Sequence, residues 1–260
     1  MRELIKAGLL ALVLSLGLAT SVVAGPFEDA LAAYARGDYA AALQLIRPLA
    51  NQGNAAAQSK LGFMYDNGQG MSRDYTAAAK WYRMAADQGN AEAETVLGMD
   101  YLLGWGVPKD YGEALKWYQK AADQGYADAQ LNLGFMYDNG QGVPQDHVEA
   151  AKWFRKAADQ GKAAAQYQLG FMYDSGQGVP QDYAAAVMWY RKAADQGYTY
   201  AQDNFGRMYE FGKGVPQDFV QAYKWYSLAT SDENRYRVTA KMTRAQITKA
   251  QKLAHEWKPK

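Results

Sequence analysis

Few residues in this 260-residue chain could carry chemistry. There is no cysteine, and His255, one of two histidines, has no metal-ligating partner nearby in the sequence. Without cysteine or a His-Glu-x-x-His motif, a zinc site is not expected. Glycine pairs such as Gly140 and Gly142 resemble those of a phosphate-binding loop, but no Lys-Ser/Thr pair follows them. The sequence therefore predicts no catalytic residue, no metal site and no cofactor.

The aspartates recur at a fixed spacing instead of forming acid–base pairs. One series comes directly before apolar helical patterns, where a carboxylate can accept hydrogen bonds from the free amides of a first turn: Asp110, Asp146, Asp182 and Asp218. Glu113 and Glu149 follow three residues after two of these aspartates and predict capping boxes. We therefore interpret the repeated carboxylates as helix caps.

These aspartates belong to a 36-residue period that runs through most of the chain. The period links five tryptophans, Trp81, Trp117, Trp153, Trp189 and Trp225, and five glycines, Gly62, Gly98, Gly134, Gly170 and Gly206. Five copies without an insertion predict a solenoid in which each unit packs on its neighbours. His147 stands where the other copies carry Tyr or Phe, which indicates a packing role.

One copy, residues 124–159, reads as a helical hairpin. Ala129, Leu133 and Tyr137 form an apolar stripe on a first helix, and the turn formers DNGQGVPQD then end that helix. The second helix is expected to bury Ala150, Trp153, Phe154, Ala157 and Ala158 and to leave Lys152, Arg155 and Lys156 in water. The fold class predicted from this pattern is an all-α solenoid of antiparallel helix pairs.

The repeated pattern A-x-A-Q-x-x-L-G-x-x-Y-x-x-G-x-G-V-P-x-D-x-x-x-A-x-x-W-x-x-x-A-A-x-x-G resembles the Sel-1-like repeat, a relative of the tetratricopeptide repeat. The resemblance covers residues 52–87, 88–123, 124–159, 160–195 and 196–231. It implies a right-handed superhelix that serves as an adaptor or binding scaffold. Small departures from the pattern are Met71–Ser72 for Val-Pro, Glu94 for Gln and Leu228 for Ala.

The segments outside the copies have other roles. Residues 1–24 combine Arg2 and Lys6 with a short apolar run and small residues at Val22 and Ala24, which is typical of a secretory signal peptide cleaved after Ala24. An uncleaved membrane anchor is the alternative. Cleavage would place the mature protein in the periplasm or outside the cell, without stable membrane insertion. Residues 25–51 and 232–260 are expected to form N-terminal and C-terminal capping helices.

Charge argues against a nucleic-acid partner, because the formal net charge of the whole chain is only +1. Residues 231–260 nevertheless hold eight basic and three acidic residues. This basic end could contact anionic lipid or an acidic partner, but the favoured interpretation is the solvated face of a capping helix.

One column of the first helices could bind a partner. It reads Phe63, Met99, Phe135, Phe171 and Arg207 and falls opposite the predicted core stripe. Four apolar residues in register would form a groove for an extended peptide or an amphipathic segment. The alternative is that these side chains pack on the neighbouring first helix.

A second candidate is the hairpin loop of copy two, in which Leu102, Leu103 and Trp105 replace polar residues of the other copies. Either a partner or the first hairpin would have to cover these side chains, and a partner contact is the favoured interpretation.

Three functions fit the sequence. The favoured one is an exported scaffold that binds an unidentified protein or peptide. The resemblance also implies an alternative function, because some secreted members of the family are described as enzymes that act on β-lactam or cell-wall compounds. No Ser-x-x-Lys set supports such an activity in this sequence. The third is an assembly component whose partner is a second copy of itself, so the oligomeric state is open.

Overall fold

The computed structural model describes residues 25–259, so the predicted signal segment lies outside the described residues. Within that range the chain forms fourteen helices and no strand. The helices are α2 (Pro26–Ala35), α3 (Tyr39–Asn51), α4 (Ala55–Asn67), α5 (Tyr75–Ala86), α6 (Ala91–Leu103), α7 (Tyr111–Asp123), α8 (Ala127–Asn139), α9 (His147–Asp159), α10 (Ala163–Ser175), α11 (Tyr183–Asp195), α12 (Thr199–Phe211), α13 (Phe219–Leu228), α14 (Asp232–Thr239) and α15 (Arg244–His255).

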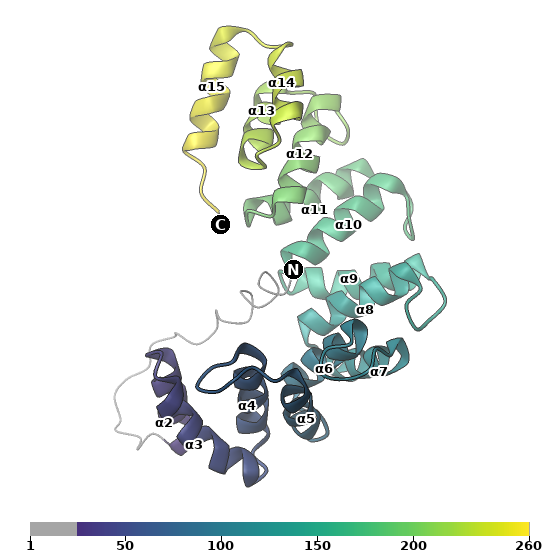
Figure 1. The fold of residues 1–260 in the computed structure, drawn as a ribbon. Coiled ribbons are helices and arrows are strands. Elements are labelled where there is room, and N and C mark those ends of the chain that lie inside the picture. Colours follow the sequence, from purple (N-terminus) through teal and green to yellow (C-terminus); the bar gives the residue numbers. More distant parts are fainter. Residues whose placement is uncertain (1–24, 260) are drawn as a thin grey trace.

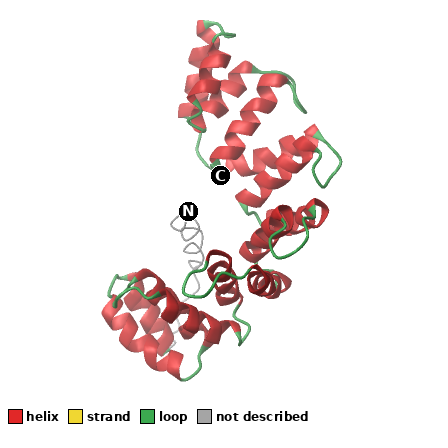
Figure 2. Ribbon diagram, turned by 45° about the vertical axis from the view of Figure 1, so that its right-hand side comes forward, coloured by secondary structure: helices red, strands yellow, loops and turns green. Residues whose placement is uncertain are grey.

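Consecutive helices pair in antiparallel fashion, and each pair packs on the next. The stack follows an open curve from α2 to α15 (Figure 1), and loops alone connect its helices (Figure 2). The predicted all-α solenoid is confirmed. No helix between residues 25 and 259 is both long and apolar enough to cross a membrane.

Caps and left-handed glycines set the helix ends. The first helix of the third repeat, α8, ends at Gly140, whose φ of 66° favours glycine. The Asp146 carboxylate then accepts from the amides of Val148 and Glu149, both at 2.9 Å, and begins α9. The predicted capping boxes at the glutamates do not form, because the backbone amides of Asp110 and Asp146 donate instead to the carbonyl oxygens of Tyr101 and Tyr137, both at 2.9 Å.

The tryptophans lie at the contact between their own repeat and the preceding one. Trp189 of α11 packs in a cluster with Phe154 and Ala158 of α9 and Leu169 of α10. Four of the five tryptophans are buried, whereas Trp81, next to the N-terminal hairpin, is only half-buried. The indole column is thus the main apolar contact between repeats.

A polar contact runs beside this apolar one. In the third repeat, the Gln130 side chain donates to the backbone oxygen of Ala122 at 3.2 Å and accepts from Gln160 Nε2 at 2.8 Å. Gln58, Gln166 and Gln202 donate in the same way to the end of the preceding second helix. Each of these carbonyls also accepts from the backbone amide of the glycine that follows its helix, so the glutamine adds a second hydrogen bond, which joins the first helix to the end of the preceding repeat.

Basic side chains cover the indoles, contrary to the prediction that they face only water. Arg155 lies 4.7 Å from the ring centre of Trp189 in the next repeat and donates to the Tyr173 hydroxyl at 2.8 Å. Lys192 covers the same ring at 4.2 Å. The charges therefore contribute cation–π attraction between repeats.

The C-terminal helices close the stack through a buried carboxylate. Glu210 of α12 is fully buried and accepts from Arg237 of α14 at 2.9 and 2.6 Å and from the Tyr226 hydroxyl at 2.7 Å. Burial alone would raise the pKa of Glu210, but the hydrogen bonds from Arg237 and Tyr226 outweigh it and lower that pKa to about 2. Arg237 thus serves as a structural counterion within the predicted basic end.

Candidate partner-binding surface

Among residues 25–259, no group of histidines and carboxylates could hold a metal ion. His147 Nδ1 lies 2.8 Å from Asp138 Oδ1, and its Nε2 lies 2.9 Å from Gln177 Nε2 of the following hairpin loop. This histidine therefore joins neighbouring repeats through hydrogen bonds.

The predicted column becomes more exposed along the stack. Phe63, Met99 and Phe135 are half-buried, while Phe171 is 44% exposed and Arg207 is also exposed. The Phe135 ring packs edge-on against Phe154 of its own repeat, with ring centres 5.1 Å apart. At the other end of the column, Phe63 packs against Tyr34 of the N-terminal hairpin.

Lys60 lies among these N-terminal rings, 3.2 Å from the ring centre of Tyr34 and 4.8 Å from that of Phe63. Burial lowers the pKa of Lys60 to about 8, and the nearby Glu92 only partly opposes this shift. The N-terminal part of the column is therefore largely filled by the chain's own side chains, and the accessible part lies on α10 and α12.

The candidate loop of copy two has a different structure from the one predicted. Leu102 and Leu103 are the last two residues of α6, and only Trp105 lies in the loop. Leu102 packs against the core of the next repeat and Trp105 is half-buried, so that Leu103 alone is exposed, at 44%.

This loop also packs closely on the preceding repeat. A Cβ atom at Gly106 would come within 2.0 Å of the backbone oxygen of Tyr75, the first residue of α5. In the four other hairpin loops, a Cβ atom at the equivalent glycine would come within 2.2 to 2.7 Å of the backbone oxygen of the first residue of the preceding second helix. Internal packing thus accounts for much of the loop.

The accessible positions form one stripe on the first helices. On α12 the stripe contains Tyr200, Asn204, Arg207 and Phe211, spaced i, i+4, i+7 and i+11 on one side of the helix. Tyr200 and Phe211 are 67% and 53% exposed. On α10 the equivalent stripe holds Phe171 between Gln168 and Ser175. We call the exposed part of this stripe, on α10 and α12, the first-helix face.

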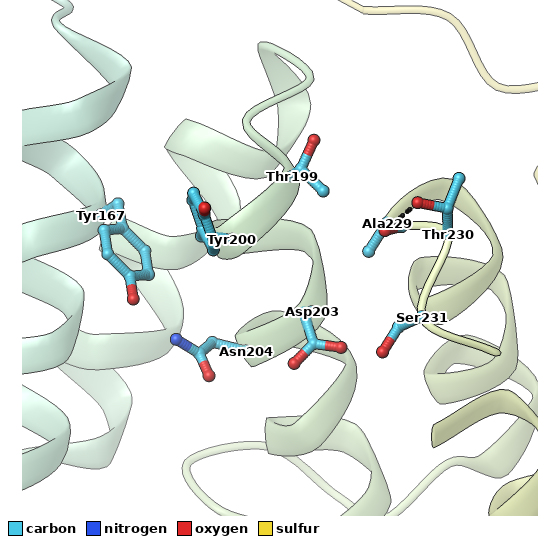
Figure 3. A pocket seen from close by; sticks show the side chains of 8 residues that line it. All are labelled: Tyr167, Thr199, Tyr200, Asp203, Asn204, Ala229, Thr230 and Ser231. Carbon is cyan, nitrogen blue, oxygen red and sulfur yellow. Dashed lines mark hydrogen bonds between the residues drawn. The ribbon is translucent and has the colours of Figure 1, made fainter. Parts of the chain in front are cut away.

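A cavity of about 450 Å³ opens beside this face (Figure 3). Tyr167 and Tyr200 form one side of it, and the turn with Thr230 and Ser231 forms the other, with Asp203 between them. Thr230 has a φ of 54°, which is a left-handed backbone conformation. In the corresponding turns of the earlier repeats, this conformation is adopted by a glycine. A threonine there is strained, because its branched Cβ crowds the backbone.

Tyr167 and Tyr200, which line this cavity, group with a third tyrosine, Tyr198. The ring centre of Tyr167 lies 5.5 Å from that of Tyr198 and 6.0 Å from that of Tyr200, and the last two lie 5.9 Å apart. Burial raises the pKa of Tyr167 and of Tyr198 above the ordinary tyrosine value, so both hydroxyls are neutral at physiological pH. We call Tyr167, Tyr198 and Tyr200 the tyrosine cluster.

The repeats of this chain match a known protein family. The Sel1 repeat model matches residues 55–90, 91–126, 127–162, 163–198 and 199–234. The chain belongs to the Sel1 repeat family. These repeats have the predicted period, and their borders fall three residues later than the predicted ones. Sel1 repeat proteins are generally non-catalytic scaffolds that bind other proteins.

Solved structures of Sel1 repeat proteins have the same fold. A Sel1 repeat protein from Oxalobacter formigenes is 35% identical over 79% of this chain and 84% of that one, with a TM-score of 0.74. The immunity protein Pa5087 from Pseudomonas aeruginosa is 19% identical over 79% of this chain and 83% of that one, with a TM-score of 0.51, and shows a likeness of fold alone. No curated protein matches the chain.

Phe171 and Arg207 belong to the predicted column, and Tyr198 and Tyr200 set copy five apart already in the sequence. Tyr167, Asp203 and Phe211 were not predicted as part of the site. The position of Asp203 beside the Thr230 turn could not be found from the period, because the second helix of copy five, α13, ends three residues earlier than its equivalents.

Proposed function

We propose that this Sel1 repeat protein is a scaffold that binds a segment of a partner protein on the first-helix face. The observation that carries the proposal is the exposure of Phe171, Tyr200 and Phe211 on two adjacent first helices. Exposed aromatic side chains in register favour an apolar contact with a peptide or an amphipathic segment. Gln168 and Asn204 stand among them and can each donate to and accept from a bound backbone.

The proposal is tested by comparing two variants in the capture of a partner. Phe171→Ala removes a side chain of the first-helix face, while Met188→Ala removes an equally exposed one, also 44%, from the second helix α11. Proteins retained by the immobilised full chain are identified, and the affinity of a purified one is then measured for each variant.

We expect about a 10-fold weaker affinity for Phe171→Ala, as for loss of a buried aromatic contact, and no change for Met188→Ala. Equal affinities for the two variants would contradict a binding site on the first-helix face. Thermal unfolding of both variants checks that the solenoid is intact.

The proposed location is the periplasm or the cell exterior, which rests on the signal-like composition of residues 1–24. N-terminal sequencing of the protein from fractionated cells tests it. A mature protein that begins at Gly25 in the exported fraction would support the proposal. An intact Met1 in the cytosolic fraction would contradict it.

A further inference from the structure

The aromatic rings of this protein are commonly covered by its own basic side chains. Lysine or arginine lies within 6 Å of the ring centres of Trp117, Trp153, Trp189 and Trp225, among others. At the turn ends, Arg73 covers Tyr75 and Lys109 covers Tyr111 in the same way. Cation–π pairing is therefore a general device of this chain.

In the described part of the chain, the rings of the tyrosine cluster have no such cover. Among residues 25–259, no lysine or arginine lies over the rings of Tyr167, Tyr198 or Tyr200, although Tyr200 is 67% exposed. The nearest arginine on the same helix, Arg207, instead donates to Asn204 Oδ1 at 3.2 Å. The exposed ring faces of the cluster are therefore open to a cation from outside the chain.

A carboxylate without a basic partner lies beside these rings. Asp203 accepts one hydrogen bond, from Asn234 Nδ2 at 2.8 Å, and forms no ion pair with a described basic residue. The hydroxyls of Thr199, Thr230 and Ser231 line the same cavity (Figure 3). The cavity is thus lined by oxygen acceptors, and its one charged lining residue, Asp203, is negative.

We propose that the cavity between α12 and the Thr230 turn binds a lysine or arginine side chain of the partner. The charged head lies over the exposed ring of Tyr200 and donates to Asp203 and the neighbouring hydroxyls, while the aliphatic part of the side chain lies along Tyr167. Charge complementarity and the exposed aromatic face select a cation over a neutral or an acidic side chain. This subsite rests on the proposed binding role of the first-helix face and gives it a charge preference.

The test uses small probes and nuclear magnetic resonance of the full chain with labelled tyrosine rings and backbone amides. N-acetyl-arginine methylamide and N-acetyl-lysine methylamide carry the charge, and N-acetyl-citrulline methylamide is the neutral match for the former. A methyl glucoside tests a saccharide as the alternative ligand. We expect saturable shifts at Tyr200 and Asp203 for the cationic probes, with a dissociation constant on the order of millimolar, as for one partly exposed cation–π and charge pair.

Two substitutions locate the binding. Asp203→Asn keeps an acceptor for Asn234 and removes the charge, and Tyr200→Leu removes the ring, so each is expected to weaken binding of the cationic probes at least about 3-fold. Tyr236→Leu is the matched control, because Tyr236 is 69% exposed but already has Arg235 5.9 Å from its ring centre.

Three results would overturn the subsite: no saturable shift, shifts of equal size with citrulline, or stronger binding of the glucoside. Each is distinct from failure of the scaffold role. Weaker partner binding by Phe171→Ala with no effect of Asp203→Asn would retain the binding face and reject the cation subsite.

Discussion

Gly170 of α10 lies against the ring of Tyr190 in α11, and a Cβ atom at position 170 would come within 2.5 Å of Tyr190 Cδ1. The ring is fully buried. The same relationship pairs Gly62 with Tyr82 and Gly134 with Phe154. The glycine at this position of the period thus permits the two helices of a repeat to pack closely.

Gly170→Ala is therefore expected to destabilise the protein by about 1–3 kcal/mol, the range for overpacking a core, despite the better helix propensity of alanine. Urea unfolding followed by circular dichroism measures the change. Gly112→Ala is the control, because its new Cβ would meet only the Asp110 side chain, at 3.3 Å. A Gly170→Ala variant as stable as the wild type would show that the helices can separate at no cost.

The hydroxyl of Tyr190 is buried and has no hydrogen-bond partner within the described part of the chain. Repeat three carries Phe154 at this position, so the repeat accommodates a ring without the hydroxyl. Tyr190→Phe is expected to raise the free energy of unfolding by roughly 1 kcal/mol, because it removes an unsatisfied buried polar group.

Tyr226→Phe is the matched comparison for this change. The Tyr226 hydroxyl donates to Glu210 at 2.7 Å, and its loss is expected to lower stability by about 1–2 kcal/mol. Thermal unfolding of the two variants should shift in opposite directions. A loss of stability in both would mean that Tyr190 has an ordered partner such as a water molecule.

Much of this packing followed from the sequence, because the period marks the residues that every repeat needs. The positions of Gly134, Trp153 and Asp146 predicted a hairpin whose helices and caps the structure contains. The roles of Arg155 and Gln130 did not follow, because both act on a neighbouring repeat. Which side chain reaches across depends on the rotation between repeats, which no pattern within one copy reveals.

The candidate site was predicted less well for the same reason. Whether Phe63 or Phe171 is accessible depends on what lies beside it, and Tyr34 of the divergent N-terminal hairpin packs against the former. In that hairpin the apolar spacing of Ala41, Leu45 and Leu49 predicts Leu45 on the inner side, but the structure buries Ile46 and leaves Leu45 38% exposed, an error of one helical position.

Glu94 makes stability depend on pH. Repeat two has Glu94 at the position where the other repeats have a glutamine that donates to the end of the preceding second helix. The Glu94 side chain is buried, with only 2% of the residue exposed. It accepts from Gln124 Nε2 at 2.7 Å, but its ionised carboxylate has no proton to donate to the carbonyl that its equivalents bind. Burial raises the pKa of Glu94, and Lys120 and Gln124 only partly oppose this.

Because the folded-state pKa lies above the unfolded value near 4.5, the folded protein holds a proton that the unfolded chain has lost. The free energy of unfolding should therefore fall as pH rises from about 4.5 through the folded-state pKa. Glu94→Gln restores the donor and is expected to stabilise the protein by roughly 1 kcal/mol at pH 7, with a smaller gain at pH 4. Urea unfolding at several pH values measures the gain, and a gain that does not change with pH would rule out titration of Glu94.

A difference between two repeats suggests a stabilising substitution. Trp117 Nε1 donates to Glu113 at 3.1 Å, whereas Trp189 Nε1 is buried without a partner among the described residues. The position equivalent to Glu113 in α11 is Ala185. In repeat two Glu113 accepts from Lys116 with Oε1 and from the Trp117 indole with Oε2, whereas in repeat three the Oε2 atom of Glu149 accepts from Lys152 and Trp153 Nε1 is unpaired among the described residues. In α11 the residue equivalent to Lys152 is Met188, which cannot compete for a new carboxylate.

Ala185→Glu is therefore expected to bond the Trp189 indole and to raise the free energy of unfolding by about 1 kcal/mol. Ala184→Glu is the control, since it adds the same charge to the first turn of α11 and has the same favourable interaction with the helix dipole, but it lies on a different side of the helix. The indole N–H resonance of Trp189 should move downfield only in Ala185→Glu. Equal stabilisation by both glutamates, with no change in that resonance, would assign the gain to the dipole and reject the hydrogen bond.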